Sequence, residues 1–140
     1  MERKLPRGIR NNNPLNIRHG CDWKGLRKEQ TDKSFAQFES MAYGLRAALI
    51  LLRNYISGWN GHRHPVNTIE AIINRWAPPS ENATSKYLDF VCTNAGLHPK
   101  EKILFRERNK IVDLLRSMAF VENGIWLERS DIESAYDLLI

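Results

Sequence analysis

The chain has 140 residues, of which 42% are hydrophobic and 26% charged, with a formal charge of +5 and a pI of about 9.4. This length suits one domain with its own core, and the composition excludes an intrinsically disordered chain. The longest apolar run, residues 47–52, is too short to cross a bilayer, so we expect no membrane span. The basic balance suits nucleic acid, an anionic membrane surface or peptidoglycan, without choosing among them.

The N-terminal residues MERKLPRGIRNNN are charged and lack an apolar segment, so we expect no secretory signal peptide. We therefore expect synthesis in the cytoplasm, and work at a cell wall would require association with a virion or delivery by another system. The two cysteines, Cys21 and Cys92, form no CxxC pair and no zinc-ligand pattern with histidine. We expect no metal and no cofactor.

The first 34 residues are polar and interrupted by glycine and proline, which predicts loops, with a short β-hairpin over residues 23–38. From Ser40 onward, apolar residues recur about once per helical turn and predict a central core helix. Gly58 and Gly61 are its expected end.

Two further helices are predicted from their capping signals. Asn67 and Glu70 have the spacing of a capping pair at the start of the next helix, which the Pro78–Pro79 pair stops. Asn82 is the expected N-cap of the following helix, and Gly96 is its expected C-cap.

The C-terminal third contains a short helical turn predicted from Pro99 to Leu104, and a longer helix over roughly residues 107–122 that ends at Gly124. A capping box, Ser130-x-x-Glu133, predicts a last short helix. No repeat or linker divides the chain. We therefore predict a single domain over residues 1–140. Its fold class is mainly α, or α+β if the small β-hairpin is counted.

Glu122 is the candidate catalytic residue. Val112, Leu115, Ala119 and Glu122 lie along one line of the predicted helix, so the carboxyl group continues an apolar stripe. Removal from water raises the pKa of a carboxylic acid and favours its protonated form, which a general acid needs to protonate a glycosidic oxygen. The alternative is a glutamate that hydrogen-bonds a neighbouring loop and has no chemical role.

The segment after Arg10 is rich in amides and holds the candidate substrate-binding residues Asn12, Asn13 and Asn16. Amides both donate to and accept from sugar hydroxyls, although asparagine also satisfies irregular backbone. Trp23 lies in a predicted loop and is a candidate for stacking on a sugar ring. Glu81 and Tyr87 stand at the rigid turn after Trp76-Ala77-Pro78, where a carboxylate also suits a helix start.

These segments resemble a group of phage and prophage proteins that are often labelled virion structural proteins and are assigned a lysozyme-like fold. The resemblance rests on residues 7–18, on Trp23 with Gly25, on Phe35-x-x-Phe38 with Tyr43-Gly44-x-Arg46-Ala47, and on residues 76–87. Residues 13–17, with Trp23-x-Gly25 and Phe35-x-x-Phe38-x-Ser40, are similar to bacterial glucosaminidases. Residues 81–88 look like the Glu-Thr-Arg-x-Tyr-Val stretch of soluble lytic transglycosylases, whose tyrosine lies near the active site.

The order of the segments departs from those enzymes, in which the helix that ends in the catalytic glutamate comes first. Here only ten residues precede the asparagine run, and Glu2 is the only glutamate among them. The similar helix end, Met118 to Gly124, is near the C-terminus. A circular permutation of a lysozyme-like domain would reconcile the two orders.

The resemblance implies cleavage of peptidoglycan glycan strands, by a lytic transglycosylase or a muramidase. If water attacks directly, Glu39 or Asp32 is the candidate second carboxylate. If neither takes part, the substrate's own hydroxyl attacks, as in transglycosylases. The alternative is a non-catalytic structural or wall-binding module on the same scaffold, with other virion proteins as partners. Nucleic-acid binding is disfavoured, because the basic residues are dispersed and no recognised motif is present.

Overall fold

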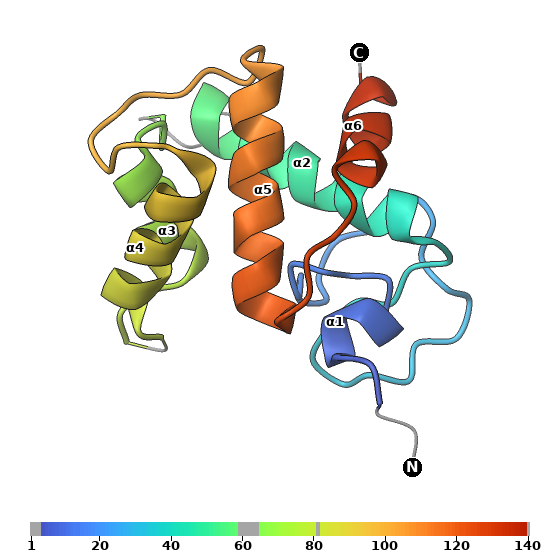
Figure 1. Ribbon diagram of the computed structural model, residues 1–140. Helices are drawn as coiled ribbons and strands as arrows, with labels where there is room; N and C mark the ends of the chain where they lie inside the picture. Colours follow the sequence, from blue (N-terminus) through green and yellow to red (C-terminus); the bar gives the residue numbers. More distant parts are fainter. Residues whose placement is uncertain (1–3, 59–64, 81, 140) are drawn as a thin grey trace.

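The structure is a computed structural model, and it describes residues 4–58, 65–80 and 82–139. Six helices form in these residues: α1 (Arg7–Arg10), α2 (Met41–Ser57), α3 (Ile69–Trp76), α4 (Thr84–Ala95), α5 (Arg108–Asn123) and α6 (Arg129–Asp137). Helix α5 runs through the middle of the molecule and packs against α1, α4 and α6 (Figure 1). The prediction of a mainly helical protein is confirmed.

The predicted β-hairpin over residues 23–38 is wrong. The described part of this segment contains only isolated antiparallel bridges, Arg18 with Phe35 and Leu26 with Phe38, and no strand. Side-chain acceptors replace the backbone hydrogen bonds that a β-hairpin would form between its strands. Gln37 Oε1 accepts from the Thr31 amide (2.5 Å), and Asp32 Oδ1 accepts from the amides of Ser34 and Phe35. Because local side chains satisfy this backbone, cross-strand pairing is not extended.

The structure corrects several predicted helix starts. Thr68, instead of Asn67, caps α3 by accepting from the Ala71 amide (3.2 Å). Helix α4 begins after Ala83, and the Asn82 side chain donates to the Pro78 carbonyl instead of capping. Ser130 lies inside the first turn of α6, which starts after Glu128, so the predicted capping box does not form.

Two other local predictions also differ from the structure. Residues 99–104 form no helix; instead, the Thr68–Lys102 bridge and the Ile103 amide, which donates to the Asn67 carbonyl (2.8 Å), attach this segment to the start of α3. The short helix α1 lies in a region predicted as loop. Its four residues are too few for a hydrophobic period to show in the sequence.

The ends of three helices follow the prediction. Gly58, Gly96 and Gly124 end α2, α4 and α5 in the left-handed conformation, as expected for glycine C-caps. Gly61 lies outside the described residues. The end at Gly124 matters most for the site, because it places the last turn of α5 against the N-terminal loop.

Gly44 permits the asparagine-rich loop to lie directly on α2. A Cβ atom at Gly44 would be 1.8 Å from the carbonyl oxygen of Asn12, a distance that no side chain tolerates. The loop is further fixed by the Phe38 amide, which donates to the Asn11 carbonyl (2.9 Å). The chain before α2 is thus a folded platform, although it contains almost no regular secondary structure.

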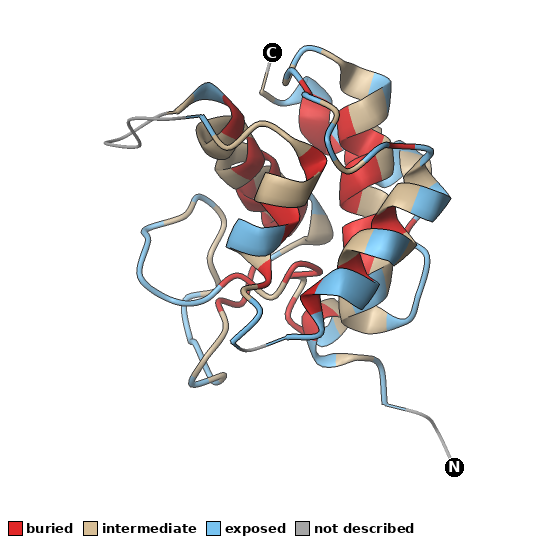
Figure 2. Cartoon of the chain, turned by 90° about the vertical axis from the view of Figure 1, so that its left-hand side faces the viewer, coloured by how far each residue is buried: buried red, intermediate tan, exposed pale blue. Residues whose placement is uncertain are grey.

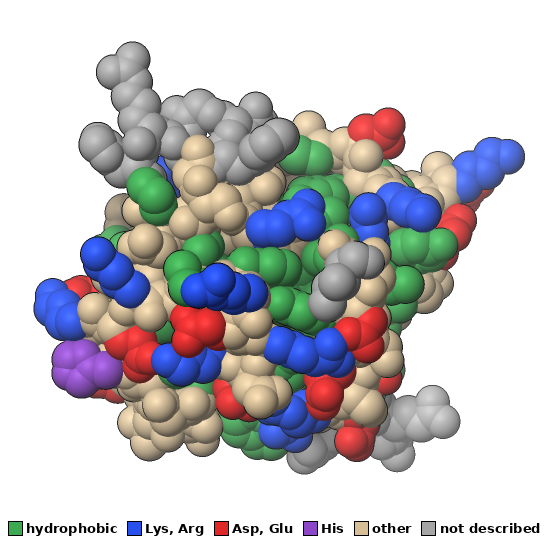
Figure 3. Space-filling model, turned by 90° about the horizontal axis from the view of Figure 1, so that it is seen from above, with side chains coloured by type: hydrophobic (Ala, Val, Ile, Leu, Met, Phe, Trp, Pro, Cys, Tyr) green, Lys and Arg blue, Asp and Glu red, His purple; other side chains and the backbone are tan. Residues whose placement is uncertain are grey.

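The core lies between the helices and continues into this platform (Figure 2). The buried stripe of α5 faces inward, and Leu15, Ile17 and Phe38 extend the core below it. Within the described residues, no helix has the length and apolar character that a bilayer crossing requires. On the face shown in Figure 3, basic and acidic side chains intermingle. Ion pairs join Arg108 to Asp137 and Lys110 to Glu101.

Candidate functional site

Glu122 lies in the last turn of α5, one residue before the end of the helix. The residues that precede it on its line, Val112, Leu115 and Ala119, are fully buried. Glu122 itself is only partly buried. The carboxyl group therefore stands where the core stripe reaches the surface.

The asparagine-rich loop contacts Glu122 from one side. Asn16 Nδ2 donates a hydrogen bond to Glu122 Oε1 (3.1 Å). The adjacent Asn123 donates to the Pro14 carbonyl (2.7 Å), which ties the same loop to the end of α5. Asn16 adopts a positive φ of 52°, a conformation that asparagine tolerates better than most residues. The loop is thus shaped to point an amide at the carboxyl group.

Tyr87 contacts Glu122 from the opposite side. Its ring is 5% exposed, and its hydroxyl hydrogen-bonds the Glu122 carboxyl group and lies 3.4 Å from the Met118 carbonyl. The single hydroxyl proton can serve only one acceptor at a time. When Glu122 is protonated, the carboxylic acid can donate to Tyr87 while Tyr87 donates to Met118. The pair therefore accommodates both protonation states.

Burial raises the pKa of Glu122 above its ordinary value, and the hydrogen bonds from Asn16 and Tyr87 oppose this rise without cancelling it. Burial also raises the pKa of Tyr87 well above its usual range, and the neighbouring Glu122 adds to that effect. The site thus combines a carboxylic acid biased toward its protonated form with a phenol that stays neutral.

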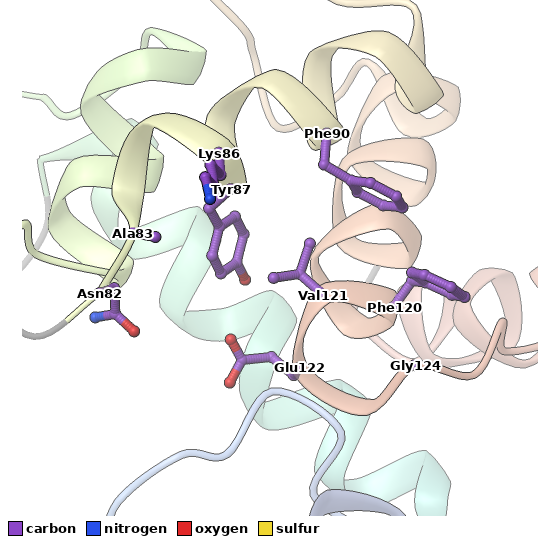
Figure 4. A pocket seen from close by; sticks show the side chains of 9 residues that line it. All are labelled: Asn82, Ala83, Lys86, Tyr87, Phe90, Phe120, Val121, Glu122 and Gly124. Carbon is purple, nitrogen blue, oxygen red and sulfur yellow. The ribbon is translucent and has the colours of Figure 1, made fainter.

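Two cavities meet at Glu122 and together form a groove. One, of about 530 Å³, is lined by α4 and the end of α5; the other, of about 400 Å³, is lined by the asparagine-rich loop and the turn after α3. Glu122 and Asn82 line both. Figure 4 shows the Glu122 carboxyl group pointing toward the Tyr87 hydroxyl, with Asn82 on the same side. We call the first cavity the aromatic half and the second the polar half.

The aromatic half ends in a stack of rings. Phe90 and Phe120 lie parallel with centroids 5.2 Å apart, and Phe120 stacks on Trp126 at 4.4 Å. Trp126 is 41% exposed, and the guanidinium carbon of Arg116 lies 5.1 Å from its ring centroid. The stack gives this end of the groove an aromatic, apolar surface.

Asn12 and Asn13 serve the backbone instead of the groove. Asn13 is fully buried, and its amide donates to the carbonyls of Ile17 and Ala36 while its oxygen accepts from the Ile17 amide. Asn12 donates to the Phe38 carbonyl (3.1 Å). Both side-chain N–H donors of Asn13 are therefore used. This geometry favours a structural role for the two residues over the sugar contact expected from the sequence.

The remaining candidates lie away from Glu122 or outside the described residues. Trp23 is partly buried against the core and lines neither half of the groove. Glu81 falls outside the described residues. Asp32 lies in a different cavity, where Arg7 pairs with it and holds the pKa of its carboxyl group far below the usual range. Glu39 is exposed and also lines neither half.

Among the described residues that line the groove, Glu122 is the only carboxylic acid. In the same part of the chain, no three His, Cys, Asp or Glu side chains gather in a way that could hold a metal ion. The arrangement can therefore donate one proton to a bound molecule and take it back, which is general acid–base chemistry by a single group.

Sequence reasoning missed several groove residues. Asn82 was assigned to a helix cap, and Arg18, Phe90 and Phe120 were not singled out. Their place in the groove depends on contacts between segments far apart in sequence. A local signal existed only for Phe120, which stands two positions before Glu122 on the same helix.

The fold and the site define a mainly helical domain with a groove centred on a partly buried carboxylic acid. No family model matches the chain. It is 38% identical over 122 residues to Protein P5 of Pseudoalteromonas phage PM2, an alignment that covers 84% of this chain and 71% of that protein. The chain therefore belongs to the family of phage Protein P5.

Proposed function

We propose that this protein cleaves the glycan strands of peptidoglycan and that Glu122 is the general acid. The observation that carries the proposal is the meeting of two cavities at Glu122, whose pKa is raised and whose carboxyl group is held by Asn16 and Tyr87. A polymer that occupies both halves would place a linkage between two sugars beside this carboxyl group. A raised pKa favours the protonated form of the carboxyl group, which is the form that can give a proton to the departing oxygen.

In the proposed step, protonated Glu122 donates its proton to the glycosidic oxygen as the bond from that oxygen to the anomeric carbon breaks. A hydroxyl of the same sugar then attacks the anomeric carbon and returns its proton to the Glu122 carboxylate. One bond breaks, one forms and Glu122 ends as it began. Tyr87 and Asn16 hydrogen-bond the carboxyl group in both states.

The proposal favours the transglycosylase route over direct attack by water. An inverting enzyme needs a second carboxylate, on the opposite face of the sugar, to activate the attacking water. A retaining enzyme needs a second carboxylate as its nucleophile. Among the described groove residues there is no such group, and Asp32 is engaged with Arg7 in another cavity.

A lysozyme-like scaffold with permuted chain order is part of the same proposal. The segment similar to a catalytic helix end lies near the C-terminus, yet it meets the asparagine-rich loop and the transglycosylase-like turn from the N-terminal side. A circular permutation requires these segments to meet in space, so their contacts support it. Membership of the Protein P5 family supports delivery to the wall by a phage particle.

Incubation of the purified protein with purified peptidoglycan tests the proposal. Release of soluble muropeptides, with a ring closed by the sugar's own hydroxyl, supports the transglycosylase route. Release of products with ordinary reducing ends supports cleavage but not that route. Sedimentation with the wall material without any release contradicts catalysis and favours a structural or wall-binding module of a virion.

A further inference from the structure

Arg18 brings a positive charge into the polar half of the groove. It lines this cavity together with Asn16, Trp76 and Glu122, and it is exposed. Within the described part of the chain, no ion pair and no side-chain hydrogen bond joins Arg18 to an acidic residue. Its donors therefore remain available to a molecule in the groove.

The Arg18 side chain is nevertheless held in place. Its guanidinium carbon lies 5.5 Å from the centroid of the Phe35 ring, and that of Arg7 lies 4.4 Å from the same centroid. Arg7 is paired with Asp32, whereas Arg18 forms no ion pair with any residue that the structure describes. A guanidinium that rests near an aromatic ring loses little freedom when it binds a ligand.

Lys86 gives the aromatic half a charge as well. It lines that cavity one residue before Tyr87, is exposed, and has no ion pair with any described residue. The groove thus has a cationic side chain on each side of Glu122. Among the described residues that line the groove, Glu122 is the only carboxylic acid, so the two cationic side chains outnumber the acidic ones.

We propose that Arg18 is a specificity-determining residue that binds a carboxylate carried by the glycan, with Lys86 as a second, weaker contact on the opposite side of Glu122. This rests on the proposed function. Peptidoglycan carries carboxylates on every second sugar, in the lactyl group or in the peptide attached to it. A planar guanidinium matches a carboxylate with two parallel hydrogen bonds, whereas a lysine acts as a point charge. A chitin-type glycan has no such group and would gain nothing from Arg18.

Binding to glycans immobilised on beads tests this inference in a Glu122→Gln background, so that binding is measured without cleavage. The three glycans are intact peptidoglycan, glycan strands freed of peptides by an amidase, and chitin. We expect Arg18→Gln to raise the half-saturating concentration roughly tenfold on at least one of the two peptidoglycan preparations, as for a hydrogen-bonded charge, and to leave chitin unchanged. Arg106→Gln, the matched control, removes an equal charge from an exposed residue outside both halves.

In intact peptidoglycan the lactyl carboxyl group is amide-linked to the peptide, whereas the amidase frees it as a carboxylate, so the two preparations identify the source. Loss of binding only on intact peptidoglycan supports a carboxylate of the attached peptide, and loss only on the peptide-free strands supports the lactyl carboxylate. Loss on both supports a site that accepts either carboxylate. An equal loss on chitin, or no loss on any glycan, overturns the inference. If the parent protein cleaves peptidoglycan but Arg18→Gln binds it normally, only the inference about Arg18 is wrong. If the parent protein does not cleave but its binding depends on Arg18, only the proposed catalysis is wrong.

Discussion

Asn16 donates a side-chain hydrogen bond to Glu122 across 3.1 Å, although 106 positions separate the two residues in sequence. The contact joins the asparagine-rich loop to the last turn of α5. It gives the carboxyl group one fixed neighbour on the platform side, while Tyr87 supplies the other from α4.

Replacing Asn16 with glycine removes the amide and keeps the left-handed backbone, which glycine adopts without strain. Because the hydrogen bond lowers the pKa of Glu122, we expect that pKa to rise and the high-pH limb of the cleavage profile to move to higher pH. The maximal rate should fall about tenfold through loss of orientation. A pH profile that does not move would contradict the assigned contact.

Replacing Tyr87 with phenylalanine removes only the hydroxyl from a buried ring. We expect the high-pH limb of cleavage to move to higher pH again, since this hydroxyl also lowers the pKa of Glu122. The free energy of unfolding should fall by about 1 kcal/mol, as for one lost buried hydrogen bond. Urea denaturation measures the second effect. The assigned contact is rejected if Tyr87→Phe loses stability with no change in the pH profile.

Replacing Gly44 with alanine should destabilise the protein, although alanine is normally the better helix former. The new Cβ would lie 1.8 Å from the Asn12 carbonyl, and backbone cannot give way as a flexible side chain can. We expect a net loss of about 2 kcal/mol or more in urea denaturation. Ser57→Ala, at the exposed end of the same helix, is the control and should be neutral or slightly stabilising. Equal stability of the two variants would show that the loop does not dock on α2 as described.

Asp32 provides a test by pH. Its pKa is lowered in the folded protein, chiefly by the hydrogen bond from Arg7, so its contribution to stability is present above the unfolded pKa. That contribution is lost as pH falls below the unfolded value of about 3.9 toward the folded one. Asp32→Asn should therefore be less stable at neutral pH and show a flatter loss of stability on acidification. Parallel pH curves for the two proteins would exclude this coupling.

The helical part of the fold could be predicted because its signals are local. The stripes of α2 and α5 repeat once per turn, and Gly124 marks the end of α5, so Glu122 could be placed at the edge of the core from sequence alone. The first 40 residues could not be predicted in the same way. Their backbone is held by side chains such as Gln37 and Asn13, whose partners depend on the fold.

The groove shows the same division. The resemblance places Tyr87 near an active site, and Tyr87 lies beside Glu122. Asn13 and Asn16 are candidates on the same grounds, as amides in a segment that shares the resemblance. Of these two, Asn16 contacts Glu122, whereas the amide of Asn13 is used within the loop. The role of Arg18 could not be predicted, because a single arginine in a loop forms no sequence pattern. Only its position in the polar half of the groove distinguishes it from other arginines.

The central claim is that Glu122 is the general acid of a glycan-cleaving groove, and the most direct test is the rate of muropeptide release by Glu122→Gln. Glu128→Gln, an exposed glutamate just before α6, is the matched control. The account predicts that Glu122→Gln lowers the rate by about 100-fold or more, as for loss of a general acid, while the control cleaves at the parent rate. Release by Glu122→Gln at the parent rate would contradict it.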